Sequence, residues 1–371
     1  MAIEFERDPI DWDINPDPIC LLCGVEVKEM IYSQPVNPTR SDVLFREKKW
    51  KHYAKARLEH VMVPSKEVEE VDFAKYPSMW SYMCRAIIKE PTTKYFLSGI
   101  TALEVKYSYP ERLPRSPYMV PKNPGMARIG GRTRNLQYDD TFIPFYPASV
   151  RRQLGRFRGK NIGFVVHAHC WALLNHIIST TLVESKMDKF VRAARKYWHD
   201  HEAWGGLDYM LMEWKLRLGP RHPGFYYGCD IYKNPFVVPE VQKAIDSARK
   251  TKKEPVKSRC SDVPLEVAIM IAEWTCPIHY TPADVNNTRN LLSAWQWTLP
   301  DGFWKSRLKE EIFVELNPLR ESDYSIDWQA LRLDLMGLVS DQEWYSSSGL
   351  PNRERVLGFM SAIKSTFLKM R

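Results

Sequence analysis

Two short motifs, far apart in the chain, carry the side chains best suited to bind a metal ion. Cys20 and Cys23 form a Cys-x-x-Cys knuckle, and Gly24 after it readily adopts the turned backbone that directs two thiolates at one ion. His167 and Cys170 are three residues apart at the start of a helical pattern, so they face the same way on the first turn of the expected helix. The combined set of three thiolates and one imidazole predicts a zinc site.

A knuckle combined with two ligands from the first turn of a helix is typical of the treble-clef arrangement, here with a large insertion of strands between its halves. Four protein ligands leave no coordination position for water, so we expect the zinc ion to support folding rather than chemistry. His169 is an alternative ligand to His167. The alternative to any metal site is that Cys20 and Cys23 are ordinary buried thiols and that His167 bonds to a backbone carbonyl in the core.

Other reactive side chains do not form a recognisable catalytic set. A zinc deaminase needs His-x-Glu ahead of Pro-Cys-x-x-Cys, whereas here the Cys-x-x-Cys comes first and His167 is followed by Ala168-His169. The cluster His199-Asp200-His201-Glu202 is better explained as the polar face of a helix. The chain contains no Walker phosphate loop, no Gly-x-Ser-x-Gly elbow and no Rossmann fingerprint. An enzyme with a pocket around these histidines and Cys229 is the least favoured hypothesis.

The arginine-rich segment 128–160 is a candidate nucleic-acid surface, because basic side chains interleaved with aromatic ones can bind phosphates and stack on bases. We favour a solvent-exposed loop whose aromatic residues pack inward, since no nucleic-acid-binding signature surrounds the segment. A nucleic-acid-binding zinc protein is thus the second hypothesis for function. The residues concerned are Arg128, Arg132, Arg134, Arg151, Arg152, Arg156, Arg158 and Lys160, with Tyr138, Phe142, Phe145 and Tyr146 between them.

The composition is that of a folded protein in a reducing compartment. At roughly 150 residues per domain, 371 residues predict two or three domains. Hydrophobic residues make up 44% and charged residues 26%, both near globular averages, which excludes wholesale disorder. Seven cysteines are too few for a disulfide framework in a chain of this length. A formal net charge of +8 permits an anionic partner without requiring one.

No segment of the sequence has the features of a membrane span or a secretory signal. The first eighteen residues are acidic and rich in proline, without a positive end or an apolar run. The most apolar stretch, Ile162–Val183, is interrupted by histidines and an asparagine, which are costly in hydrocarbon. We therefore expect a cytoplasmic or nuclear protein without membrane contact.

The elements that must position these motifs are strands followed by helices. Residues 80–150 contain many prolines and glycines with short extended pieces between them, which predicts strands and loops. Helical periodicity returns at Cys170 and continues in a second run, Met187–Leu218. Residues 243–259 carry many lysines and arginines with few acidic residues, which indicates an exposed linker or a fraying helix end.

The helix expected after Asp262 has more apolar surface than a single small domain normally buries. Asp262 and Pro264 form a helix start signal. The helix then carries apolar residues along one face and further apolar residues outside that face, and such a wide apolar surface is typical of a helix that binds a partner. The face contains Leu265, Ala268, Ile269 and Ala272, and the further set contains Val267, Met270, Ile271 and Trp274. A second helix is expected from about Asp284 and a short third element within Leu299–Leu308, with Asp301 as its cap.

Two motifs frame these three helices. The first is Val263-Pro264-Leu265-Glu266-Val267, with Ile269 and Ile271, and the second is Leu299-Pro300 with Phe303-Trp304-Lys305-Ser306-Arg307-Leu308. They are similar to the Leu-Pro-x-Glu-Leu opening and the Leu-Pro-x-x-Phe-Trp-x-Ser-Arg-Phe closing of the F-box family. The chain resembles the fungal F-box-like proteins more closely, through Cys20-x-x-Cys23-Gly24, His167-x-x-Cys170-Trp171, Asp327-Trp328 and Asn352-Arg353-x-Arg355.

This resemblance implies a non-enzymatic role. F-box proteins dock through a three-helix module on the Skp-family adaptor of a cullin-RING ubiquitin ligase and present a captured protein substrate. The anchors expected to contact the adaptor are Pro264, Leu265, Ile269 and Trp304. The zinc-bearing half and the terminal helices are then the part that faces the substrate.

The expected fold class is α+β. A mixed, zinc-bearing, treble-clef-like N-terminal region is expected to pack with an all-helical, F-box-like C-terminal region. The expected divisions are a zinc-bearing region 1–240, a basic linker 241–260, a three-helix module 261–310 and a helical extension 311–371.

Overall fold

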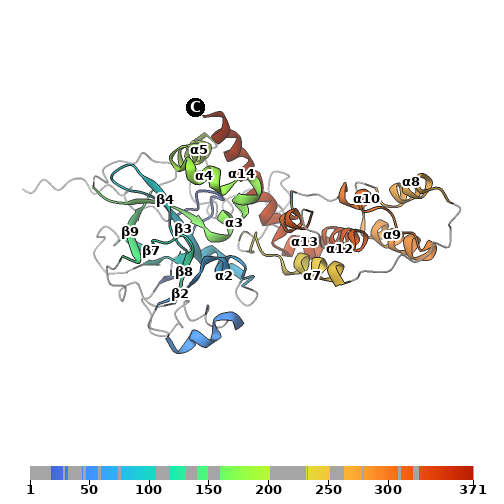
Figure 1. Cartoon of the computed structure of the whole chain (residues 1–371), viewed down its shortest axis with the longest axis horizontal. Coiled ribbons are helices and arrows are strands. Elements are labelled where there is room, and N and C mark those ends of the chain that lie inside the picture. The colour runs from blue at the N-terminus through green and yellow to red at the C-terminus, as the bar shows by residue number, and fades with distance from the viewer. Residues whose placement is uncertain are drawn as a thin grey trace, which may run out of the picture. The chain divides into compact units, whose positions relative to one another are not determined.

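The computed structural model divides the chain into two compact units (Figure 1). Unit 1 comprises Met1–Phe225, Ile231–Phe236 and Arg355–Arg371, and unit 2 comprises Tyr226–Asp230 and Val237–Glu354. Strands and helices are mixed in unit 1, while every described element of unit 2 is a helix. The residues described are 18–27, 30–31, 44, 47–56, 60–73, 77–105, 117–130, 140–148, 159–200, 231, 233–250, 263–277, 280–307, 311–320 and 326–370.

Unit 1 is built on a six-stranded sheet (Figure 1). Five strands run in the order β4-β3-β10-β9-β7, and the sixth strand, β5, also pairs with β3. The central strands β3 and β10 are antiparallel and almost wholly buried, so their apolar residues form the centre of the core. Their register places His167 opposite Cys84. The strands are β3 (Met83–Lys89), β4 (Tyr95–Leu97), β5 (Thr101–Ala102), β7 (Tyr118–Pro121), β9 (Phe142–Pro147) and β10 (Ile162–His167).

In the described part of unit 1, two smaller strand pairs and three short helices accompany the main sheet. Strand β2 (Val61–Pro64) pairs antiparallel with β8 (Met126–Ile129), and β1 (Met30–Ile31) pairs parallel with β6 (Glu104–Val105). The strands and loops expected within residues 80–150 are thus confirmed for the described part of that range. The short helices here are η2 (Lys48–Ala56), α2 (Ser65–Glu69) and η3 (Pro77–Tyr82).

The apolar stretch Ile162–Val183 forms three separate elements. It contains β10, then α3 (Ala168–Ile177), and the start of α4 (Thr180–Ser185). The chain leaves α3 at Ile178, whose backbone is extended. Among the described residues, no helix combines the length and the apolar character needed to cross a membrane.

Two longer helices, α5 and the later part of α14, complete the described part of unit 1. Helix α5 (Met187–Asp200) buries an apolar face, and the part of α14 (Leu350–Lys369) after Glu354 packs in the same unit. Phe190 of α5 contacts Phe367 of α14, and the Lys364 ammonium donates to the Ile177 carbonyl at 2.7 Å. The expected division 311–371 is therefore wrong at its end, because the residues of α14 from Arg355 onward belong with the N-terminal half. An amphipathic helix does not reveal from its own sequence which core it covers.

The described part of unit 2 is a helical bundle around one apolar core. Helix α9 begins with a capping box, in which Thr281 and Asp284 bond to each other's backbone N–H groups. Asp301, expected to cap α10, is instead its first residue, and Pro300 occupies the cap position. The helices are α7 (Pro239–Lys250), α8 (Leu265–Thr275), α9 (Pro282–Trp295), α10 (Asp301–Lys305), η6 (Val314–Leu316), α11 (Asn317–Arg320), α12 (Trp328–Ser340), α13 (Gln342–Ser347) and the first residues of α14.

The expected basic linker 241–260 is wrong for residues 241–250, which lie in α7. Their buried residues recur at helical spacing and pack into the core of unit 2. The lysines and arginines occupy the other positions of the same helix, so a count of charges alone suggested a linker. The buried residues are Val241, Ala244, Ile245 and Ala248. Residues 251–262 lie outside the described part of the chain.

Candidate metal centre

The structure brings together the four predicted ligands. One ligand atom from each of Cys20, Cys23, His167 and Cys170 lies within 4.8 Å of the other three, and all four residues are fully buried. Two come from the loop at residues 18–27, one ends strand β10, and one lies in the first turn of α3. The set therefore joins two segments separated by 144 residues in sequence.

The knuckle is a tight turn held by backbone hydrogen bonds. The Gly24 N–H donates to the Cys20 carbonyl at 3.0 Å, and the Cys20 N–H donates to the Val25 carbonyl at 2.9 Å. Gly24 has a φ of 72°, in the left-handed region that glycine adopts without a steric penalty. The Leu21 N–H donates to the Val165 carbonyl at 2.8 Å, which fixes the turn to strand β10.

His167 occupies the junction between strand and helix. Its backbone is extended, with φ −61° and ψ 142°, so it is the cap residue of α3 and not part of the first turn as expected. Its imidazole nevertheless faces the thiols: Nδ1 lies 3.3 Å from Cys23 Sγ and 3.9 Å from Cys170 Sγ. Its backbone N–H donates to Cys20 Sγ at 3.3 Å. Strand β10 therefore directs both the ring and the backbone of His167 into the cluster.

Electrostatics within the cluster favour a charged sulfur at Cys20. Burial raises the pKa of Cys20, but hydrogen bonds from Cys170 and Cys23 and the positive charge of His167 outweigh it, so the pKa lies well below the ordinary value. Burial lowers the pKa of His167, but the negative charge on Cys20 and Cys23 raises it to about 10. Burial also raises the pKa of Cys170, as do its bonds to the other two thiols. The positive charge of His167 thus stabilises the thiolate of Cys20.

The donor set fits a tetrahedral metal ion. Four donors that all lie within 4.8 Å of one another surround a common centre, and three sulfurs with one imidazole nitrogen are typical structural zinc ligands. With four protein donors, no coordination position remains for water or substrate. The arrangement can cross-link the N-terminal loop to β10 and α3.

His169, the alternative ligand, lies outside the cluster. Its ring is buried against Phe73 and Phe236, with centroids 5.7 and 6.2 Å away. Burial, together with the charge of His167, lowers the pKa of His169 to about 3, so this ring is neutral at physiological pH. His167 and not His169 is therefore the imidazole that faces the thiols.

Two further side chains donate hydrogen bonds to backbone carbonyls of the knuckle. The Trp198 indole N–H donates to the Leu21 carbonyl at 2.7 Å, and the Arg355 guanidinium donates to the Cys23 carbonyl at 3.0 Å. Trp198 has no role in the predictions from sequence, and Arg355 is named there only as part of the Asn352-Arg353-x-Arg355 motif. One signal in the sequence could have indicated the burial of Arg355. It is a basic residue directly next to Val356, an apolar residue on the side of the terminal helix that is expected to be buried.

Substitution of Gly24 by alanine is expected to destabilise unit 1 by about 2–4 kcal/mol, the sum of overpacking and of a left-handed backbone at a residue with a Cβ. The added Cβ would lie 2.7 Å from a ring carbon of Trp198, which is itself buried. Denaturant unfolding measures the change in the free energy of unfolding.

Gly358→Ala is the matched control for Gly24→Ala. Gly358 lies in α14, and a Cβ added there has no atom within 4 Å, so the helix should gain up to about 1 kcal/mol. Equal unfolding midpoints for the two variants would contradict the tight fit of Gly24 against Trp198.

The predicted partner surface lies partly open and partly buried. Leu265 and Pro264 are exposed, whereas Ile269 is half-buried against the core of unit 2. Trp304 is only 1% exposed, so its prediction as an anchor for a partner is wrong: its ring fills the core beside Phe303. The exposed apolar side chains of α8 are Leu265 (47%), Val267 (42%), Met270 (58%) and Trp274 (88%). Val267, Met270 and Trp274 lie on one side of the helix, whereas Leu265, its first residue, lies on the side of Ala268 and Ala272. We call these four exposed residues together the α8 face.

Arg128 and two aromatic residues in the described part of segment 128–160 pack inward, whereas Lys160 is exposed. The Arg128 guanidinium is buried and donates to Thr101 Oγ1 at 2.8 Å and to the Ala102 carbonyl at 3.2 Å, so Arg128 is not available to a phosphate. Phe142 and Phe145 are buried as well, in line with the favoured interpretation. The Lys160 ammonium lies 4.7 Å from the centre of the Tyr146 ring. The other arginines of the segment, and Tyr138, lie outside the described residues.

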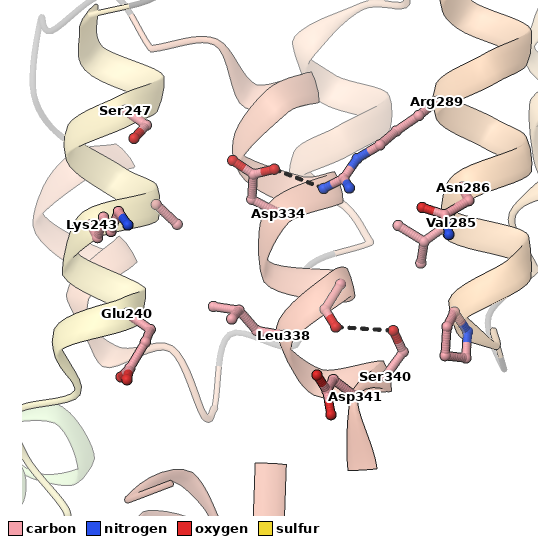
Figure 2. A pocket seen from close by; sticks show the side chains of 13 residues that line it. Glu240, Lys243, Ser247, Val285, Asn286, Arg289, Asp334, Leu338, Ser340 and Asp341 are labelled. Carbon is pink, nitrogen blue, oxygen red and sulfur yellow. Dashed lines mark hydrogen bonds and ion pairs between the residues drawn. The ribbon is translucent and has the colours of Figure 1, made fainter. Parts of the chain in front are cut away.

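Unit 2 contains an open groove of about 530 Å³ between α7, α9 and α12 (Figure 2). The Arg289 guanidinium donates to the Asp334 carboxylate at 2.7 Å, and the Ser340 hydroxyl donates to the Gly337 carbonyl at 3.1 Å. The residues that line the groove include neither cysteine nor histidine. They offer no thiolate and no nucleophile activated by an imidazole.

The polar cluster at the end of α5 is consistent with a solvent-facing surface. His199 and Asp200 are both exposed, and Asp200 accepts from the Lys196 ammonium one turn earlier at 2.8 Å. His201, Glu202 and Cys229, the remaining members of the hypothetical pocket, lie outside the described residues.

The assignment of the metal centre rests on its own geometry. Buried thiols, a facing imidazole and a tight glycine turn are local features that need no relative for their interpretation. Comparison of the chain with protein-family models, with curated proteins and with solved structures finds no match to any of them.

Proposed function

We propose that the chain is a non-enzymatic F-box-type substrate receptor, which docks on the Skp-family adaptor of a cullin-RING ubiquitin ligase and carries a structural zinc ion. The observation that carries the proposal is the α8 face. Four large apolar side chains on one eleven-residue helix remain exposed in unit 2, although this unit buries an extensive core of its own. Such a patch costs free energy in water unless a partner covers it.

The underlying helix supports this role. Ala268 and Ala272 are the only fully buried residues of α8, and Ile269 and Ile271 are partly buried against the core of unit 2, while the four residues of the α8 face remain exposed. An amphipathic helix of this kind gains affinity by placing a few apolar anchors in a groove of the partner. The Glu273 carboxylate pairs with Arg307 at 2.5 Å and so holds the end of α8 next to α10.

The order of elements agrees with the sequence resemblance. Helices α8, α9 and α10 occupy the stretch framed by the Val263-Pro264-Leu265 and Leu299-Pro300 motifs. Trp304, in the closing motif, belongs to the core of this module and stabilises it. The contact with the adaptor is therefore assigned to Pro264 and the α8 face.

The proposed zinc ion would be held by Cys20, Cys23, His167 and Cys170 in a treble-clef-like setting. When bound, it supplies a cross-link and no reaction chemistry, because its four positions are taken by protein. The residues themselves bring the knuckle onto β10, through Leu21 and the backbone N–H of His167. This half of the chain would then form a stable surface for a protein substrate.

Co-purification with a Skp-family adaptor tests the docking proposal. Wild-type chain is expected to bind, and Leu265→Asp to weaken binding by at least about 30-fold, the loss of one apolar anchor of about 2 kcal/mol. Because Leu265 is 47% exposed, the fold should remain intact, which circular dichroism and the unfolding midpoint check.

Leu368→Asp is the matched control for this experiment. Leu368 is 57% exposed, also lies in a helix, and belongs to unit 1 and not to the proposed module. Loss of binding in Leu265→Asp but not in Leu368→Asp would support the proposed face. Binding retained by Leu265→Asp, or no binding by the wild-type chain, would refute the assignment.

A further inference from the structure

Arg355 is a buried cation attached directly to the metal centre. Its side chain is almost completely buried, and Nη1–H donates to the carbonyl oxygen of Cys23, itself a predicted ligand, at 3.0 Å. The Phe359 ring, one turn later on α14, lies 5.5 Å from the guanidinium carbon. Burial of an arginine is costly unless hydrogen bonds or a negative charge compensate it, and the bond to Cys23 places this positive charge at the knuckle.

The proposed centre carries the opposite charge. A zinc ion of charge +2 with three thiolates and one neutral imidazole carries a formal net charge of −1. This negative charge would be fully buried, since all four ligands are. A buried charge is stabilised by an opposite charge nearby, and interactions of this kind strengthen as the local dielectric constant falls.

Two other buried arginines of unit 1 bond to residues outside the knuckle. Arg85 donates to the Glu69 carboxylate at 2.6 Å, so its charge is balanced there. Arg128 bonds to Thr101 and Ala102 on strand β5. Arg355 is the buried arginine of unit 1 whose described hydrogen bond reaches the knuckle itself.

We infer that Arg355 is a positioning residue of the metal centre, whose positive charge balances the buried anionic zinc–thiolate cluster and whose hydrogen bond orients Cys23. The inference rests on the proposed zinc site. It also gives α14 a specific role, because this helix then contributes the counter-charge to a centre whose knuckle, with Cys20 and Cys23, lies more than 300 residues earlier in the chain.

Two conservative variants separate charge from hydrogen bonding in the full-length chain. Arg355→Lys keeps the positive charge, and Arg355→Gln keeps an N–H donor while it removes the charge. Zinc affinity, measured by competition with a chelator, is expected to fall by about 10- to 100-fold in Arg355→Gln, the range for loss of a group that supports metal ligands. Arg355→Lys should stay within about threefold of the wild-type chain, because the charge remains.

The absorption spectrum of the Co²⁺-substituted chain supplies a readout of charge near the sulfurs that a loss of packing alone does not change. Co²⁺ in a thiolate site shows sulfur-to-metal charge-transfer absorption, and a nearby positive charge lowers the energy of the sulfur electrons. The band should therefore shift to lower energy in Arg355→Gln and stay in place in Arg355→Lys. Lys364→Met is the control, because Lys364 lies on the same helix and also donates to a backbone carbonyl, that of Ile177, outside the knuckle.

The outcomes distinguish this inference from the zinc proposal. If the wild-type chain binds neither Zn²⁺ nor Co²⁺, both fail. If it binds about one equivalent and Arg355→Gln binds as tightly with an unshifted band, only the role of Arg355 fails. Equal losses in the Lys and Gln variants, or an equal loss in Lys364→Met, would also overturn it, because the effect would then come from packing and not from charge.

Discussion

Replacement of Cys20 by serine is expected to remove the metal from the purified chain and to abolish cooperative unfolding of unit 1. Cys20 is fully buried, and its Sγ accepts the backbone N–H of His167 at the junction between β10 and α3. Serine does not replace a thiolate as a zinc ligand, so the cross-link between the N-terminal loop and the sheet is lost.

The expected effect is large on the scale of protein stability. A structural zinc ion contributes an apparent free energy of about 10–16 kcal/mol at pH 7, whereas whole domains are stable by only about 5–15 kcal/mol. The knuckle buries a run of apolar side chains, Leu21, Leu22 and Val25 among them, which would become exposed when the turn opens. Removal of zinc from the wild-type chain by a chelator should therefore produce the same partly unfolded state as the substitution.

Metal analysis and thermal unfolding check this expectation. The wild-type chain should contain about one equivalent of zinc, as one four-ligand site requires. Cys84→Ser is the control, because Cys84 is also buried in unit 1 and donates to the Thr101 carbonyl at 3.4 Å, but it is not one of the four clustered ligands. A metal-free wild-type chain that unfolds cooperatively would refute the centre, as would equal metal contents in the two serine variants.

The ligands were predictable because their chemistry is local. The spacing of Cys20 and Cys23 before a glycine, and the position of His167 and Cys170 at a helix start, are properties of short segments. The surplus apolar residues of α8 could be predicted for the same reason, and Met270 and Trp274 are indeed exposed. Local patterns thus indicate which residues have a chemical role.

Tertiary placement was not predictable in the same way. Trp304 and Leu265 are both apolar residues in the motifs of the F-box resemblance, yet one is buried and the other is exposed. The two arginines of Asn352-Arg353-x-Arg355 lie two residues apart and belong to different units. Burial depends on segments that are distant in sequence. A short pattern therefore does not tell whether an apolar residue such as Trp304 or Leu265 is buried, or which group a buried arginine such as Arg353 or Arg355 will contact.

Arg353→Met is expected to destabilise unit 2 by about 3–5 kcal/mol, the usual cost of breaking a buried ion pair from one side. The Arg353 side chain is fully buried and donates to both carboxylate oxygens of Glu315, at 2.7 and 2.8 Å, and to the Ile312 carbonyl at 2.8 Å. Methionine fills part of the volume but leaves the Glu315 carboxylate without this partner in a poorly solvated site. The apparent melting temperature of this unit should fall by more than about 10 °C.

Two comparisons show whether the buried carboxylate causes this loss. In Arg353→Met with Glu315→Leu, no charge is left behind, so much of the stability should return, because replacing both partners of a buried pair is often nearly neutral. Arg289→Met breaks a half-exposed pair with Asp334 in the same unit and should cost no more than about 1 kcal/mol. If the Arg353 and Arg289 variants unfold at the same denaturant concentration, the bidentate pair is not a main determinant of stability, and apolar packing around Leu316 and Leu350 must hold the start of α14 instead.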